Sequence, residues 1–187
     1  MKFEAVLRKA GIKSLPRFSN LESSRAKAIV GAALLDHLLE QVLRHHMIGK
    51  PEESLFGAYG PLSSLSAKID IAKSLGILTA GESADLHRVR KIRNAFAHSL
   101  DELSFRDRSI QNHVHQLQVR AGTILGKKGA PRLDFELCVL VLSGFLLGRI
   151  EEAQVRPNPR EFVAHLATLA KRKRNAHRKG GHRASAV

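Results

Sequence analysis

Apolar side chains recur along most of the chain at intervals of three and four residues, the spacing that places them on one face of an α-helix. Convincing strand alternation does not occur, and no internal repeat is evident. Glycine, proline and capping residues divide the pattern into segments. The predicted helices cover residues 3–10, 21–47, 62–76, 79–98, 107–121, 133–150 and 158–170. The sequence therefore predicts an all-α fold, a single helical bundle of about six or seven helices.

The segment 21–47 is apolar on two sides. Its main stripe consists of Ile29, Ala32, Leu35, Leu39, Val42 and Leu43. Leu34 and Leu38 add apolar surface on the far side. Such a helix needs two sets of neighbours, which either a second protomer or the rest of its own bundle can supply. The first alternative predicts a homodimer, and the second predicts a helix at the centre of one bundle.

The segment 79–98 opens with Thr79 and Glu82, which are spaced as in a capping box. One face of this predicted helix is apolar and carries Leu86, Val89, Ile92, Phe96 and Leu100. A second face holds polar residues that we expect to bind a ligand or partner, namely His87, Arg90, Asn94 and His98. This helix is therefore the first place to look for function.

Arg93 falls among the apolar positions of the same segment. Because a guanidinium cannot be neutralised there, it needs an acidic or carbonyl partner. Asp36 and Glu40 project from the edge of the main stripe of the 21–47 helix. We therefore expect a structural ion pair between Arg93 and one of these acids.

The formal net charge is +14, which predicts a polyanionic partner such as nucleic acid. Residues 171–187 contain no acid, and their seven cations are Lys171, Arg172, Lys173, Arg174, Arg178, Lys179 and Arg183. We expect one domain over residues 1–170, followed by a disordered basic tail over 171–187. The tail is interpreted as a nonspecific phosphate-binding segment, the alternative being a solvated tail that only adds solubility.

Cys138 is the only cysteine, so an internal disulfide cannot form, and a reducing, cytoplasmic location is expected. The longest uncharged run, residues 137–148, is shorter than the roughly 20 residues of a bilayer span, so no membrane association is expected. Neighbouring histidines fall on divergent helix faces, at His45, His46, His113 and His115. Their spacing does not favour a metal site, and we expect no cofactor.

Two segments carry a family resemblance. The first contains Leu55-Phe56-Gly57, Gly60-Pro61-Leu62, Ser66-Ala67-Lys68-Ile69 and Leu75-Gly76-Ile77-Leu78, and the second contains Leu86 and Arg90-Lys91-Ile92-Arg93-Asn94-Ala95-Phe96-Ala97-His98. Together they resemble the mannitol operon repressor family, and the similarity extends roughly over residues 20–150. The resemblance implies an all-helical repressor of a sugar-alcohol uptake operon.

Members of that family lack an obvious helix-turn-helix, and this sequence favours the same conclusion. Residues 71–77 imitate the first helix and turn of such a motif. However, Glu82 and Asp85 open the next helix, where they would face phosphates. We therefore expect repression through protein partners, through contact between basic surface and nucleic acid, or through both.

Arg93 and His98, with four residues between them, also resemble the short signature of the HEPN helical superfamily. Many of its members are metal-independent endoribonucleases that act as dimers. The resemblance implies that His98 acts on the ribose 2′-hydroxyl or the leaving oxygen, that Arg93 stabilises charge at phosphorus, and that Asn94 orients His98. A nuclease is thus the alternative to a non-enzymatic regulator. In the regulator, Arg93 would have a structural role and His98 would be a cation at a helix end.

Overall fold

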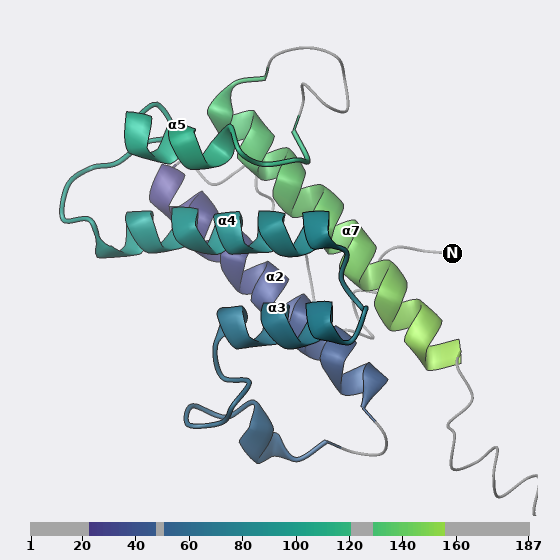
Figure 1. The fold of residues 1–187 in the computed structure, drawn as a ribbon. Coiled ribbons are helices and arrows are strands. Elements are labelled where there is room, and N and C mark those ends of the chain that lie inside the picture. The colour runs from purple at the N-terminus through teal and green to yellow at the C-terminus, as the bar shows by residue number, and fades with distance from the viewer. Residues whose placement is uncertain (1–22, 48–50, 121–128, 156–187) are drawn as a thin grey trace, which may run out of the picture. The chain divides into compact units, whose positions relative to one another are not determined.

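The computed structural model describes residues 23–47, 51–120 and 129–155 (Figure 1). These ranges contain five α-helices and one 3-10 helix. Their bounds are α2 Ser24–His46, η2 Glu53–Leu55, α3 Leu65–Ser74, α4 Ala80–His98, α5 Arg108–Val114 and α7 Pro131–Val155. These ranges contain no strand, so the all-α prediction is confirmed. The helices expected over 3–10 and 158–170, the boundary at residue 170 and the basic tail over 171–187 lie outside the described residues.

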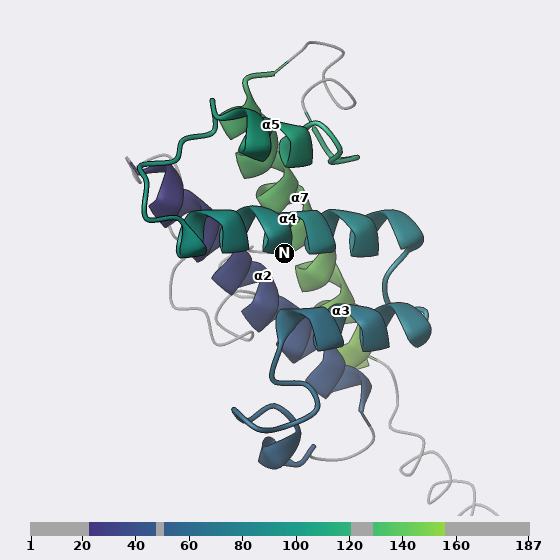
Figure 2. The same ribbon diagram turned by 60° about the vertical axis from the view of Figure 1, so that its left-hand side comes forward.

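Helix α2 is buried on both of its apolar sides. It packs against α3 and α4, and the views in Figures 1 and 2 agree that α3 and α4 lie side by side across it. Both Leu34 and Leu38, on the far side from the main stripe, are buried, whereas Ile29 in the stripe is partly exposed. Each fully buried leucine contributes about 2 kcal/mol to the hydrophobic stabilisation. Both sides are thus covered within one protomer, as expected for a helix central to its own bundle, and the dimer loses the support that it drew from this helix.

Helix α7 is tied to the other helices by two ion pairs. Lys27 of α2 is fully buried, and its Nζ lies 2.6 Å from Glu136 Oε1. Arg149 near the other end of α7 donates to both carboxylate oxygens of Glu82 on α4, at 2.8 and 2.9 Å. A buried ammonium is costly unless it is paired, so these contacts fix how α7 lies on α2 and α4. Within the described residues, no helix is both long and apolar enough to cross a membrane.

Helix α4 begins with the predicted capping box. The Thr79 hydroxyl accepts from the Glu82 backbone N–H at 3.2 Å, and the Glu82 carboxylate accepts from the Thr79 N–H at 2.8 Å. The predicted apolar face is buried at Leu86, Val89, Ile92 and Phe96. Leu100 was wrongly placed on this face, because α4 ends at His98 and the backbone of Ser99 is extended, which leaves Leu100 fully exposed.

The two ends of α4 are held by groups from distant parts of the chain. At the C-terminal end, Arg25 of α2 donates to the carbonyl oxygens of Ser99 and Asp101, at 2.8 and 3.0 Å. Near the N-terminal end, Asp85 is buried and accepts from the backbone N–H groups of Gln118 and Val119. The sequence predicts a helix over 107–121, but α5 ends at Val114. The next residues form turns and bends, in which Gln118 and Val119 are bound by Asp85.

The pKa of Glu82 follows from its contacts. Burial raises it, but the hydrogen bonds from Thr79 and the contact with Arg149 outweigh burial, so the pKa lies below its ordinary value of 4.5. The folded chain therefore stabilises the ionised carboxyl more than the unfolded chain does. This contribution to stability is complete above the unfolded pKa and is lost as the pH falls through the lowered, folded pKa.

We expect Glu82→Gln to lower the free energy of unfolding at about pH 7. The difference in this free energy between the variant and the wild type should become smaller as the pH falls below about 4.5. Urea unfolding followed by circular dichroism over this pH range measures both effects. Glu152→Gln is the matched control, because Glu152 is exposed on α7. If the wild type and Glu82→Gln have parallel pH profiles, the carboxylate does not make the contribution assigned to it.

Candidate functional site

A pocket of about 410 Å³ lies where α2, the start of α3 and the middle of α4 meet. Its lining residues are Ala32, Ala33, Asp36, Ser63, Ser64, Leu65, Ser66, Arg90, Arg93 and Asn94. Arg90, Arg93 and Asn94 are at positions i, i+3 and i+4, which place them on one side of α4. The pocket therefore gathers three residues that the sequence singled out for function or ion pairing, together with Asp36.

The start of α3 forms a second wall of this pocket. Ser64 is its N-cap, and the Ser64 hydroxyl accepts from the Ala67 backbone N–H at 3.2 Å. Capping of this kind satisfies one of the backbone donors at the helix start, while the first-turn donors and the positive end of the helix dipole remain directed outwards. Residues 63–66 thus line the pocket together with the guanidinium groups of α4.

The expected ion pair between Arg93 and Asp36 or Glu40 is wrong. Lys68 of α3 instead forms ion pairs with both acids, with its Nζ 2.9 Å from Asp36 Oδ1 and 2.9 Å from Glu40 Oε2. Arg93 is exposed, and its guanidinium donates to Asn94 Oδ1 at 2.9 Å. The position of Arg93 lies at the edge of the buried stripe, from which a long side chain reaches solvent.

Lys68 is a buried charged residue that the prediction for this site did not include, although its position in the sequence carries a signal. Lys68 stands three residues after Leu65 and next to Ile69, inside the apolar spacing of α3. It is 3% exposed, and its two carboxylate partners are what make this burial tolerable. A lysine at an apolar position of one predicted helix, together with two acids at the edge of another, indicates a buried ion pair between the two helices.

Glu40 connects this ion pair to the loop before α3. Arg44 contacts Glu40 and Glu53, each at 3.0 Å, and its guanidinium lies 4.1 Å from the centre of the Phe56 ring. Burial raises the pKa of Glu40, but hydrogen bonds from Lys68 and Arg44 outweigh burial and lower it. The carboxylate is therefore ionised in the folded chain and links α2, α3 and the loop.

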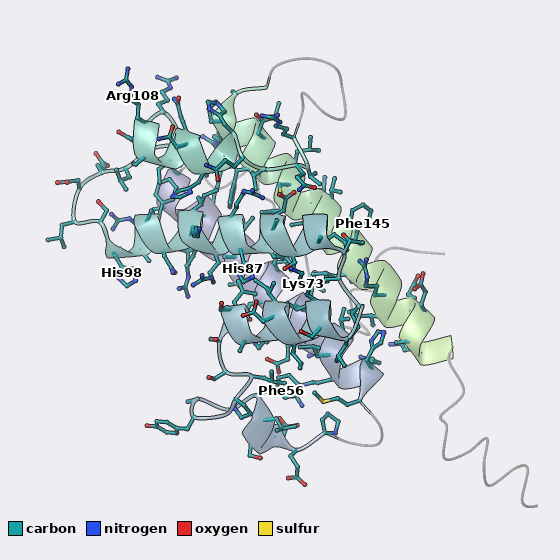
Figure 3. All side chains as sticks on the ribbon, viewed as in Figure 1. Phe56, Lys73, His87, His98, Arg108 and Phe145 are labelled. Atoms are coloured by element: carbon teal, nitrogen blue, oxygen red, sulfur yellow. The ribbon has the colours of Figure 1, made fainter. Side chains whose placement is uncertain are left out.

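The structure divides the polar face predicted on α4. Arg90 and Asn94 line the pocket, whereas the ring of His87 contacts Asp70 of α3, with 3.1 Å between Nε2 and Oδ1. His98 is exposed at the C-terminal end of α4, far along the helix from His87 (Figure 3). The four residues thus do not form one site, and the pocket holds Arg93 without His98.

The histidines of α2 have structural partners. The Nδ1 atoms of His45 and His46 each lie 2.8 Å from a backbone carbonyl one turn earlier, those of Gln41 and Val42. Within the described ranges, no group of three or more His, Cys, Asp and Glu side chains is arranged to hold a metal ion. Cys138 is buried, and burial raises the pKa of its thiol well above the ordinary value.

A family model described as "Mannitol repressor" matches residues 25–131, which is more than half of the chain. The chain belongs to the mannitol repressor family. The matched range contains α2 except its first residue, all of α3, α4 and α5, and every residue that lines the pocket. The site thus lies in the part of the chain that carries the family identity, whereas most of α7 and the basic tail lie beyond it.

A solved structure has the same fold. The protein in the X-ray structure of the MtlR-HPr complex from Escherichia coli superposes with a TM-score of 0.59 at 19% sequence identity, covering 78% of this chain and 98% of that chain. No curated protein matches this mannitol repressor family member. The likeness extends over nearly the whole of the solved chain, so the helical architecture is shared.

We expect Lys68→Met to lower the free energy of unfolding by roughly 2–3 kcal/mol, because two carboxylates lose their counter-charge but are both partly exposed. Lys73→Met on the same helix is the control, since Lys73 is exposed, and it should change stability by less than about 0.5 kcal/mol. Denaturant unfolding measures both variants. Equal losses would show that the Lys68 pair does not hold α3 on α2.

Proposed function

We propose that this chain is a transcriptional regulator of the mannitol repressor type that acts through a protein partner, an HPr-like protein being the first candidate. The observation that carries the proposal is membership of the mannitol repressor family over α2 to α5. The shared fold with a protein whose structure was solved in complex with HPr supports the choice of partner. The regulated genes would be those for uptake of a sugar alcohol.

The start of α4 supports a route through protein contacts. Asp85 is buried under residues 118–119, and Glu82 is engaged by Thr79 and Arg149. The two acids at this helix start are therefore engaged by the protein's own groups, and they stand where a groove-reading helix would present donors to DNA. Phosphate contact by the basic tail over 171–187 and a homodimer stay predictions, and the first of them would add nonspecific affinity for nucleic acid.

The partner is tested by titrating the full chain with the HPr of the same organism in a calorimeter. We expect saturable binding that persists when the ionic strength is raised, because a specific interface depends less on charge than nonspecific attraction to a cationic chain does. An unrelated acidic protein of similar size is the control for the +14 net charge. A chain lacking residues 171–187 should bind HPr unchanged, whereas an absence of binding in both chains would contradict the proposed partner.

Regulation is tested separately with a transcriptional reporter for the sugar-alcohol uptake genes. Deleting the gene for this chain should raise reporter expression in the absence of the sugar alcohol, and supplying the wild-type chain should restore repression. Unchanged expression after deletion would contradict the assignment as a repressor.

Arg93 and His98, both exposed on α4, keep the nuclease alternative open to direct test. We expect no cleavage when the purified chain is incubated with varied RNAs in the presence of EDTA, as suits a regulator. Arg93→Ala, His98→Ala and the control Lys91→Ala, which removes an exposed cation from the same helix, are compared. Cleavage lost in the first two variants and kept in the third would replace the regulator with a metal-independent nuclease.

A further inference from the structure

The pocket between α2, α3 and α4 carries positive charge that the described parts of the chain do not neutralise. Arg90 and Arg93 both line it, and neither forms an ion pair with a described residue. The acid in the lining, Asp36, has Lys68 Nζ 2.9 Å from its Oδ1. The two guanidinium groups thus face a space in which the one lining carboxylate already has a counter-charge.

Arg90 adds a donor that needs a partner. Its Nε is buried and has no hydrogen-bond partner among the described residues. A buried donor without a partner costs stability. Because protein atoms cover Nε, a ligand in the pocket would be bound by the rest of the Arg90 guanidinium group and not by Nε. The Arg93 guanidinium donates to Asn94 Oδ1 at 2.9 Å, and both side chains line the pocket.

The opposite wall suits the same ligand. The Ser63 and Ser66 hydroxyls line the pocket beside the start of α3, and the Leu65 and Ser66 backbone N–H groups belong to its first turn. First-turn donors have no partner within their own helix, and the helix dipole favours an anion there. The start of α3 and the two arginines come from different elements, and both line the pocket with groups that favour a ligand with negative charge.

We propose that this pocket binds a small molecule that carries a phosphate group and hydroxyl groups. The planar guanidinium groups and the start of α3 would hold the phosphate oxygens. Asp36, whose side chain is 35% exposed, and the serine hydroxyls would bind the hydroxyl groups of the ligand. A volume of about 410 Å³ fits a small molecule and is too small for a duplex or a folded partner. This assignment adds an effector site to the regulator and does not depend on its partner.

The test uses the full, isotope-labelled chain and amide chemical shifts in an NMR titration. Glycerol 3-phosphate, inorganic phosphate and glycerol are the three probes, at ionic strength matched with sodium chloride. We expect saturable shifts at residues 63–66 and 90–94 with glycerol 3-phosphate, weaker binding of inorganic phosphate and no response to glycerol. Absence of shifts at these residues would overturn the proposal. Equal affinity for the two phosphates would overturn the assignment of the hydroxyl contacts.

Variants separate this pocket from general attraction to a basic surface. Arg93→Gln removes an exposed charge and should weaken glycerol 3-phosphate binding about tenfold, the effect of losing one charge-assisted hydrogen bond. Arg90→Gln is a second variant with the same expected direction. Lys91→Gln removes the same charge from the same helix but does not line the pocket, so its affinity should stay within about twofold of wild type. Equal weakening in Arg93→Gln and Lys91→Gln would overturn the proposal.

Discussion

The contact of Lys68 with Asp36 and Glu40 is the constraint on which the arrangement of the site depends. An ammonium that is only 3% exposed must have its charge compensated, and both compensating carboxylates lie on α2. This requirement determines where α3 lies on α2. The start of α3 carries Ser63 to Ser66, so the same contact determines the wall that faces Arg90 and Arg93 across the pocket.

Much of the fold could be predicted because its signals are local. The apolar spacing located α2 and α4, and the pair Thr79 and Glu82 located the start of α4, because both patterns depend only on residues within one or two turns. The end of α5 could not be predicted in this way. After Val114, Asp85 accepts from the backbone N–H groups of Gln118 and Val119, which lie 33 and 34 positions later in the chain, and a contact over such a separation leaves no local signal.

The sequence indicated which residues of α4 belong to the site, but it did not indicate which groups they contact. Arg90, Arg93 and Asn94 stood out because charge and amide groups were concentrated on one helix, and all three line the pocket. Their opposite wall at residues 63–66 gave no signal, since serines before a helix are ordinary capping residues. Arg93 was assigned an acid partner from its angular position alone, but Lys68 has the buried position between the helices and Arg93 has the exposed edge.

Asp36 lines the pocket and is also paired with Lys68. The charge of a ligand in the pocket would therefore act on the ion pair as well. A phosphate held by Arg90 and Arg93 would be a like charge for Asp36 and an opposite charge for Lys68. Because Lys68 is buried and Asp36 is only partly exposed, the attraction and the repulsion are screened less than on an open surface. Binding of a phosphate in the pocket and the packing of α3 on α2 would therefore act on the same few charges, so a change in one would act on the other.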